Sequence, residues 1–303
     1  MQLRHLQYFV ALARERHFGR AAATVNVTQS TLSAAIGQLE AEIGAPLIER
    51  DRRFRNLTAE GQTLLTWARR ILAEREALDQ EVALLRDRLR GELTLGVIPT
   101  ALPTIALLTT PFNRRHPDVT LKVLTRTSDE IQQALDEFRF DGGVTYLDNE
   151  PLHGVRTVPL YDERYILLTF ADGPFAGRDR VTWHEAAEMP LSLLTPDMQN
   201  RRIIDGIFRE VGRAPRVQAE TNSVMTLCSH IRTGEWSSVL PHNFLWVFGT
   251  PPGMLALPLV EPVRTHTVGL VVRDQEPLPP LARAIEAAAR EADMGRTLAA
   301  LAI

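Results

Sequence analysis

Two groups of polar side chains in this 303-residue sequence have types and spacing suited to binding. The first lies near the N-terminus, where amide and hydroxyl side chains are followed by a run of arginines: Gln29, Ser30, Thr31, Ser33, Arg50, Arg52, Arg53 and Arg55. Amides and hydroxyls can hydrogen-bond to base edges, and arginines can contact phosphates or enter a minor groove. The pattern favours contact with DNA. The alternative is that these residues only cap a helix and form a solvated surface.

The second group follows predicted strands in the C-terminal two thirds of the chain. It occupies positions where helices are expected to begin: Thr100, Ala101, Ser128, Thr145, Tyr146, Thr195, Gln199, Asn222 and His242. In open α/β sheets a ligand binds beyond the carboxyl ends of the strands, against helix N-termini. Each residue alone could be only a helix cap, but several in one crevice would suit a small anion. Gln199, Arg201 and His242 are the expected partners of a carboxylate.

Motifs of catalysis are missing from the sequence. It contains no Gly-x-Ser-x-Gly, phosphate-loop, His-Glu-x-x-His or dinucleotide-binding pattern. Its eight histidines are scattered without metal-ligand spacing. We therefore expect no catalytic residues, no metal and no cofactor. The single cysteine, Cys228, excludes an internal disulfide and is expected to pack on an apolar helix, with a redox-responsive thiol as the alternative.

Length and charge indicate more than one domain. A chain of 303 residues with 45% hydrophobic residues can build two or three cores. Residues 1–58 carry 8 arginines against 5 acidic residues, whereas the whole chain has a net charge of −3. A basic head on an acidic body is typical of a nucleic-acid reader with a second function. The N-terminus lacks the pattern of a signal peptide, and no run reaches the ~20 apolar residues of a membrane span, so we expect a cytoplasmic protein with no membrane partner.

The polar residues of the first group need a helical frame to present them. Apolar periodicity predicts helices over 3–15, about 18–24 and 28–43, with Thr28 as the N-cap of the third and Gly44 at its end. Three helices with a tight turn between the second and third describe a helix-turn-helix. The arginine run that follows suits a two-stranded wing. We expect residues 1–58 to form a winged helix-turn-helix domain.

At these positions the sequence resembles the LysR-type transcriptional regulators. The motifs are LRHLQYFVALARERHFGRAAATVNVTQSTLSAAIGQLEAEIGAPLIER and LTAEGQTLL, with a family spacing at Phe9, Phe18, Ala21, Ala22, Gln29, Leu32, Ser33, Ile36, Leu39, Glu40, Gly44, Leu47, Arg50, Thr58 and Gly61. The resemblance implies that Gln29, Ser30 and Ser33 contact an operator. Ala34 and Gly37 stand where family members often have basic residues. This shifts the expected phosphate contacts toward the wing arginines and Arg4, Arg16 or Arg20.

Residues 59–90 are predicted to form a long linker helix. Apolar residues recur there in steps of three and four, interrupted by Arg75: Leu64, Ala68, Ile71, Leu78, Val82 and Leu85. Packing onto the helix's own domain is the alternative. The stretch resembles the antiparallel dimerisation helix of the family, which implies a homodimer that reads double-stranded DNA with dyad symmetry. Family members usually pair dimers into homotetramers.

The remaining residues, 91–303, alternate predicted strands and helices, so the overall fold class is α/β. Among these elements are two separate strands on either side of residue 162, VRTVPLY and YILLTF, and a single terminal helix over 279–299. We expect two lobes, lobe I over 91–162 and 266–303 and lobe II over 163–265, joined by crossovers near 162 and 265. This part resembles the periplasmic-binding-protein-like effector domain of the family. A solute-binding protein would share it, but would need an export signal and would not carry a helix-turn-helix.

The resemblance implies a transcription regulator that responds to a small molecule bound between the lobes. Thr100 and Ser128 match effector-binding positions of the family. The segments DGGVTYLDNEPL and ERDRRF resemble members found beside formate dehydrogenase genes, so a small organic anion such as formate is the expected effector. RNA polymerase is a further expected partner.

Overall fold

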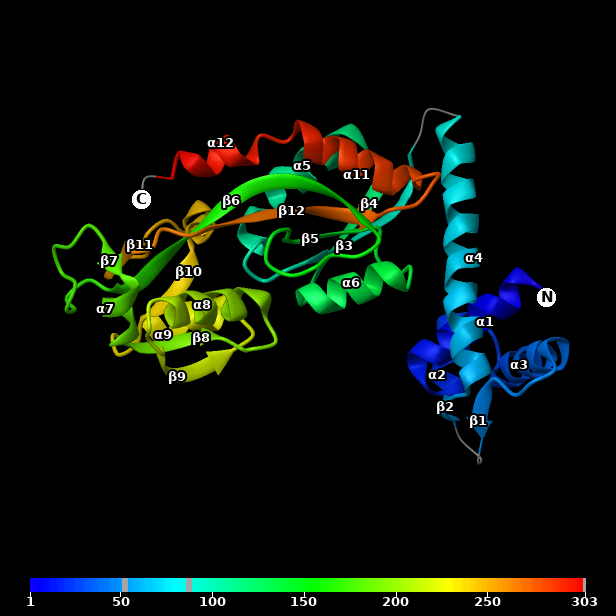
Figure 1. Cartoon of the computed structure of the whole chain (residues 1–303). Helices are drawn as coiled ribbons and strands as arrows, with labels where there is room; N and C mark the ends of the chain where they lie inside the picture. Colours follow the sequence, from blue (N-terminus) through cyan, green and yellow to red (C-terminus); the bar gives the residue numbers. More distant parts are fainter. Residues whose placement is uncertain (51–53, 86–88, 302–303) are drawn as a thin grey trace. The chain divides into compact units, whose positions relative to one another are not determined.

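The computed structural model describes residues 1–50, 54–85 and 89–301, with no side-chain description for Arg50. The chain forms two compact units, one over residues 1–87 and one made by most of residues 88–303. Each is described by itself below (Figure 1). No helix in the described ranges is long and apolar enough to cross a membrane.

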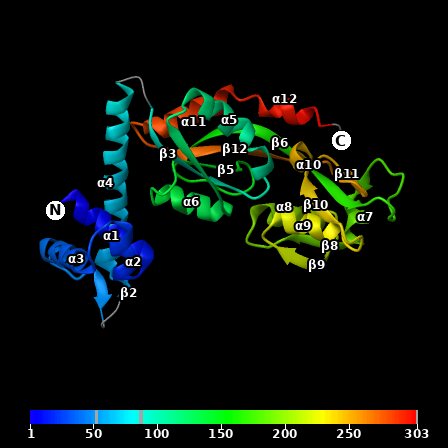
Figure 2. The same cartoon turned by 180° about the vertical axis from the view of Figure 1, so that it is seen from behind.

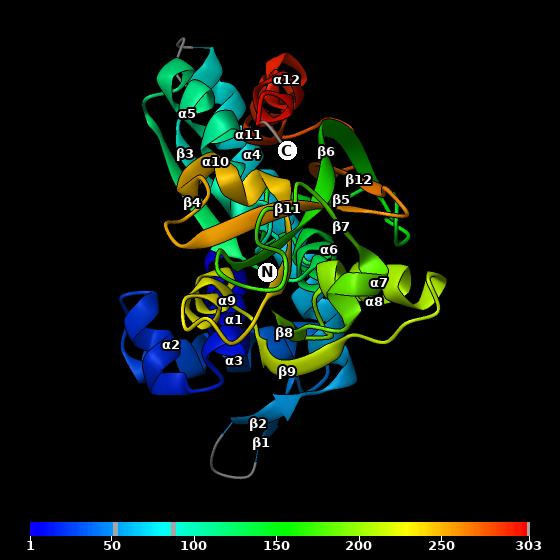
Figure 3. The same ribbon diagram turned by 90° about the vertical axis from the view of Figure 1, so that its left-hand side faces the viewer.

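The N-terminal unit is a winged helix-turn-helix followed by a long helix. Its elements are α1 (Leu3–Glu15), α2 (Phe18–Thr24), α3 (Gln29–Ile43), β1 (Ile48–Arg50), β2 (Phe54–Leu57) and α4 (Ala59–Leu84). The expected limits of α3 are confirmed, because Thr28 accepts a hydrogen bond from the Thr31 amide and Gly44 adopts the left-handed conformation that ends the helix. Figure 3 shows β1 and β2 as a hairpin at the tip of this unit.

The small residues of α2 lie in the core of this unit. Ala21 and Ala22 on α2 are buried against Phe9, Leu32 and Leu39 of the neighbouring helices. Small side chains let α2 lie close to its neighbours. Gly61 does the same for α4, since a Cβ there would lie 2.0 Å from the Leu47 carbonyl oxygen, next to the wing.

The C-terminal unit is built on one continuous eight-stranded sheet and a separate parallel pair. The elements that make its first half are β3 (Gly91–Val97), η1 (Leu102–Thr104), α5 (Ala106–Arg115), β4 (Val119–Thr125), α6 (Ser128–Asp136), β5 (Gly142–Tyr146) and β6 (Val155–Phe170). Strands β4, β3 and β5 are parallel neighbours, and β12 (Thr265–Arg273) pairs antiparallel with both β5 and β6. Helices α11 (Pro280–Glu291) and α12 (Met294–Ala299) complete lobe I, where α11 packs on α5 and α12 on β6.

Lobe II contains the remaining elements. They are β7 (Val181–Thr182), α7 (Trp183–Ala187), β8 (Pro190–Leu194), α8 (Gln199–Glu210), β9 (Arg216–Thr221), α9 (Val224–Ile231), β10 (Ser238–Pro241), η2 (His242–Phe244), α10 (Leu245–Phe248) and β11 (Met254–Val260). Strands β8 and β9 are parallel, and β10 and β11 both pair antiparallel with the end of β6. Figure 2 shows α8, α9, β8 and β9 gathered on one side of β6 and β12.

The α/β class, with a helix-turn-helix head and a mixed C-terminal domain, is confirmed. One expectation was wrong. Two separate strands were expected on either side of residue 162, but β6 runs unbroken from Val155 to Phe170. Its first part pairs with β12 and its last part with β10 and β11. At this crossover a single strand therefore connects the lobes without a loop, whereas the return expected near 265 runs through residues 261–264 between β11 and β12.

Candidate DNA-binding surface and interlobe cleft

The start of α3 is exposed, but part of its polar side chains caps the helix. The Thr28 hydroxyl lies 2.9 Å from the Ser30 hydroxyl and 2.8 Å from the Thr31 hydroxyl. Gln29 is exposed and Ser33 is half-buried one turn later. Capping is therefore observed at this end of the helix, and it does not exclude the predicted contact with DNA, since a capping hydroxyl that faces solvent can still meet a phosphate.

The wing is a short antiparallel pair with an irregular register between Glu49 and Arg50. Arg50 ends β1, and Arg55 is an exposed residue of β2. The predicted contacts Arg52 and Arg53 lie outside the described residues. Of the predicted wing arginines, the structure therefore describes Arg50 by its backbone and Arg55 by its exposed side chain.

The linker helix corrects part of the predicted dimer seam. Leu64 and Ala68 are buried in the core of the head together with Leu65, and Ile71 packs partly against it. These residues therefore hold α4 to its own domain, which was the alternative in the sequence, and Leu64 and Ala68 are not available to a partner. The second half of the predicted seam is exposed: Leu78 by 61%, Val82 by 47% and Leu85 by 86%.

Trp67 belongs to the same exposed stripe, although the heptad pattern omitted it. It is 54% exposed and lies under the guanidinium of Arg70, 5.6 Å from the ring centre. Residues 67, 78 and 85 are separated by three and two helical turns, so they share one face of α4. From this spacing, the sequence could have identified Trp67 as part of the exposed stripe.

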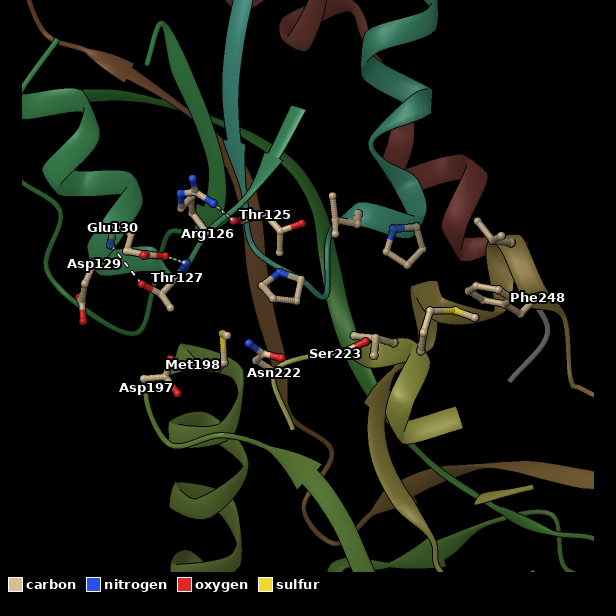
Figure 4. Close-up of a pocket in the computed structure, with 16 residues that line it drawn as sticks. Thr125, Arg126, Thr127, Asp129, Glu130, Asp197, Met198, Asn222, Ser223 and Phe248 are labelled. Atoms are coloured by element: carbon tan, nitrogen blue, oxygen red, sulfur yellow. Dashed lines mark hydrogen bonds between the residues drawn. The ribbon is translucent and has the colours of Figure 1, made fainter. Parts of the chain in front are cut away.

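A cavity of about 930 Å³ lies between the two lobes. Figure 4 shows its lining side chains, which come from the ends of β3, β4 and β9 and from η1, α6, α9 and α10. Of the predicted ligand-binding residues, only Asn222 lines this large cavity. Four others, Thr100, Ser128, Tyr146 and Gln199, line an adjoining space of about 10 Å³, which is room for about one water molecule. The two spaces share Pro99, Thr127 and Met198 in their walls.

Tyr146 is the centre of a hydrogen-bond network that joins the lobes. Its hydroxyl donates to Glu163 Oε1 at 2.5 Å, accepts from the Asn200 side-chain amide at 2.9 Å and lies 3.3 Å from the Thr100 hydroxyl. Thr100 follows β3 in lobe I, Asn200 begins α8 in lobe II, and Glu163 lies on β6 where the lobes meet. Asn243 extends the network by donating to the Thr100 carbonyl at 2.9 Å.

Glu163 was not predicted as a site residue. It is fully buried, and its Oε2 has no hydrogen-bond partner among the described residues. Burial raises the pKa of this carboxyl to about 8, an effect that the hydrogen bond from Tyr146 opposes and the nearby Asp148 reinforces. Because an acidic residue in an apolar strand is normally exposed, the sequence carried no signal for this position.

Several other buried polar atoms of the C-terminal unit also lack partners within the described ranges, and of their residues Ser128 and Asn200 line the small space. They are the Ser128, Thr145 and Thr195 hydroxyls and the side-chain oxygen Oδ1 of Asn200. Buried polar atoms are nearly always paired, with protein, water or a ligand. Ala101, also predicted here, is buried and supplies only backbone, since its amide bonds the Ile98 carbonyl.

The predicted role of His242 was wrong. Its ring lines a different cavity, of about 120 Å³, together with Arg164 and Pro258. Its Nδ1 accepts a hydrogen bond from the Arg164 amide, and burial lowers its pKa to about 4. The ring is therefore neutral near pH 7 and does not face the interlobe cavity.

Two matches to family sequence profiles cover most of the chain. Residues 3–62 match the bacterial regulatory helix-turn-helix protein of the lysR family, and residues 86–293 match the LysR substrate binding domain. The chain is 31% identical over 284 residues to the DNA-binding transcriptional dual regulator OxyR of Escherichia coli (strain K12), with 92% of this chain and 91% of OxyR covered.

Two further proteins support the same assignment. A probable hydrogen peroxide-inducible genes activator of Mycobacterium leprae (strain TN) is 32% identical over 240 residues, covering 78% of this chain and 77% of its own length. The structure of a full-length cysteine variant of OxyR from Pseudomonas aeruginosa is similar with a TM-score of 0.77 and 26% identity, over 98% of this chain and 97% of that one. The chain belongs to the LysR family: it is a DNA-binding transcriptional regulator with a C-terminal effector-binding domain.

Proposed function

We propose that a small molecule bound in the interlobe cavity controls how this regulator acts on DNA. The observation that carries the proposal is the pair of buried, unpartnered polar atoms in the space that adjoins the cavity, at Ser128 and Asn200. A ligand shifts the arrangement of the lobes only by binding one arrangement more tightly than another. Tyr146 and Asn200 join the lobes beside the cavity, so a ligand there would change that preference directly.

We propose that each of the three parts predicted from the sequence has its own role. Residues 1–58 read DNA through Gln29, Ser33 and the wing arginines, residues 59–90 form the dimerisation helix, and residues 91–303 bind the effector. A homodimer formed through the exposed stripe of α4 would read an operator with dyad symmetry. Pairing of dimers into a homotetramer, contact with RNA polymerase and a cytoplasmic location complete the proposal.

Oxidation of Cys228 is the second candidate signal, because relatives are named for hydrogen peroxide. Two observations weigh against it. Cys228 is the single cysteine of the chain, so it has no partner for an internal disulfide. Burial raises the pKa of its thiol to about 11, which keeps it protonated at neutral pH, whereas the thiolate is the reactive form. These observations favour ligand binding over thiol chemistry.

Formate, the effector expected from the sequence, has only the faint subgroup resemblance in its favour. The relatives are not named for formate. The space beside Thr100 and Ser128 holds about one water molecule as it stands, so even formate would have to open it. Formate therefore enters the test below as one compound among several.

The test is a thermal-shift screen of the full chain against formate, larger organic acids and amines. A ligand at about 100 times its dissociation constant adds roughly 2.7 kcal/mol, which raises the midpoint by several degrees. A variant with Thr100→Val and Ser128→Ala should lose this shift and the effector response while still binding a selected operator. The matched control, Thr110→Val with Ser229→Ala, removes two hydroxyls outside the cavity and should keep both. Loss of DNA binding together with the response in the first variant would contradict the proposal.

A further inference from the structure

The size and wall of the interlobe cavity select against a very small ligand. A volume of about 930 Å³ corresponds to roughly thirty water molecules and to the upper range of cavities that hold drug-sized molecules. Much of its wall is apolar, made by Pro99, Leu102, Pro103, Met198, Val224, Met225, Val247 and Phe248. Met225, Val247 and Phe248 are exposed to solvent at 61%, 55% and 41%, so a ligand would cover apolar surface that is now wet.

The charged side chains of the cavity have a negative balance. Three carboxylates line it, Asp129, Glu130 and Asp197, against the single guanidinium of Arg126. Arg126 donates to the carbonyl of its neighbour Thr125 at 2.6 Å. Figure 4 shows the three carboxylates toward one end of the cavity and Phe248 at the opposite end. A ligand spanning the cavity would therefore meet carboxylates at one end and an aromatic wall at the other.

Arg202 lies near this acidic end but does not reverse its charge. Asp129 and Asp197 both raise the pKa of Arg202, after a larger effect of its hydrogen bonds to Glu150, so the two carboxylates lie close to one guanidinium. That guanidinium donates to both carboxylate oxygens of Glu150, at 2.6 and 2.7 Å. The positive charge of Arg202 is therefore balanced by Glu150. The negative charges of Asp129 and Asp197 on the cavity wall are not cancelled by it.

The helix N-termini at the cavity, which favour anions, do not cancel this balance. The α6 end is capped by its own residues, because Thr127 and Glu130 exchange hydrogen bonds between side chain and backbone. The Ser223 hydroxyl caps α9 by accepting from the Thr226 amide. Even three uncapped ends, at about half a unit charge each, would supply about one and a half positive units against two negative ones, so the balance would stay negative.

The polar floor between the lobes offers a hydrogen-bond acceptor. Asn200 uses its amide nitrogen to donate to Tyr146, so its remaining side-chain oxygen is an acceptor that lacks a donor among the described residues. Asn200 is 3% exposed and lines the small space that adjoins the large cavity. An N–H group of a ligand would satisfy this acceptor, whereas a carboxylate would not.

We infer that the effector is an amphipathic organic cation, with an ammonium group toward Asp129 and Asp197 and an apolar, ring-sized body against Met225, Val247 and Phe248. This inference rests on the proposed function and names the chemical class of ligand for the same cavity. It replaces the small organic anion expected from the sequence. Recognition of the cation combines charge attraction at one end of the cavity with burial of apolar surface at the other. A ligand therefore needs both features to bind selectively.

The experiment compares matched amines and acids on the full chain. The probes are phenethylamine against 3-phenylpropionate and tryptamine against 3-indolepropionate, each pair sharing one skeleton, with formate as the small anion. Dissociation constants are measured by calorimetry at low and at physiological salt. We expect both amines to bind at least tenfold more tightly than their matched acids, and the difference to shrink as salt screens the carboxylates.

Variants then locate the binding. Asp129→Asn with Asp197→Asn should weaken amine binding by about two- to fivefold for each carboxylate, as expected for exposed ion pairs, and should leave the acids unchanged or slightly tighter. Phe248→Ala should weaken amines and acids alike. Asp172→Asn, an exposed carboxylate outside the cavity, is the matched control and should change nothing. Melting temperatures of the free variants verify that each one folds.

The outcomes separate the inference from the proposed function. Acids that bind as tightly as their amines, or amines that bind equally well to the double Asp variant, would overturn the cationic class. The proposed function would still stand if that binding were lost in the variant with Thr100→Val and Ser128→Ala. No binding by either amine would also overturn the class. A ligand response that maps outside the cavity would overturn the proposed function itself.

Discussion

Glu163 is a carboxyl group enclosed by protein at the point where one strand passes from lobe I to lobe II. Around it lie the hydroxyls of Tyr146, Tyr161 and Tyr165 and the carboxylate of Asp148. His266 is paired opposite it on β12, and no cation is among the causes of its shifted pKa. A buried charge without an opposite charge is costly, so the group binds a proton instead. The network between the lobes is therefore built around a carboxylic acid rather than an ion pair.

This residue predicts a pH dependence of stability. Its pKa is about 8 in the folded protein against an ordinary value of 4.5. The folded state thus holds a proton that the unfolded chain releases above about pH 4.5, and this stabilisation is lost as the pH rises through 8. At its steepest the loss is about 1.4 kcal/mol per pH unit. The Glu163→Gln variant lacks the titrating group, so its melting temperature relative to wild type should rise by several degrees between pH 6 and pH 8.

Glu235→Gln is the control for this measurement, because Glu235 is exposed on the same domain. Its melting temperature should follow the wild type at every pH. Parallel curves for Glu163→Gln and wild type would show that Glu163 is already ionised in the folded protein, and the account of the lobe network would be wrong.

At the scale of elements, the close packing of α4 beside the wing requires that residue 61 has no side chain. A Cβ on Gly61 would collide with the Leu47 carbonyl, which is backbone and cannot turn away. Gly61→Ala should therefore lower the melting temperature of the head and weaken DNA binding through displacement of the wing. Gly37→Ala is the matched control, since an added Cβ there meets nothing within 4 Å and alanine favours a helix by up to about 1 kcal/mol. A Gly61→Ala head as stable as wild type would contradict this packing.

The exposed stripe of α4 leads to a second prediction at this scale. Trp67, Leu78 and Leu85 leave apolar surface on one helix face, which is costly unless a partner covers it. Leu78→Asp with Leu85→Asp should convert the protein to a monomer in light scattering, with an unchanged melting temperature of the head. Gln62→Asp with Thr66→Asp places the same charges on another exposed part of α4 and should leave assembly intact. A dimer that survives the first pair of substitutions would place the interface elsewhere.

For the whole molecule, DNA binding by a head with net charge +3 should depend steeply on salt. Each phosphate neutralised contributes about 0.9 to the slope of log affinity against log salt concentration. Arg55→Ala should reduce the magnitude of that slope by about 1 and weaken all operators alike, if Arg55 contacts a phosphate. Arg180→Ala removes an exposed arginine of the C-terminal unit and should leave the slope unchanged. Equal slopes for wild type and Arg55→Ala would argue against the wing as a phosphate contact.

The sequence by itself determined the elements whose signals are local. Helices α1, α2 and α3 begin and end where periodicity and the caps Thr28 and Gly44 predicted, because a capping hydrogen bond joins residues three positions apart. The α/β alternation of residues 91–303 was readable for the same reason. The strand β11 and the short elements β7, α7, η2 and α10 were not predicted, and the single predicted C-terminal helix is divided into α11 and α12 at Ala292 and Asp293.

Only the tertiary structure decided which faces are covered and which polar groups meet. Leu64 and Leu78 have the same residue type and belong to the same repeat, yet one is buried in the head and the other is 61% exposed, because the head packs against only the first half of α4. Glu163, Tyr146 and Asn200 are brought together by pairing between strands and by the placement of α8. Burial depends on residues distant in the chain, so neither the unusual pKa of Glu163 nor the acidic wall of the cavity could be inferred from local spacing.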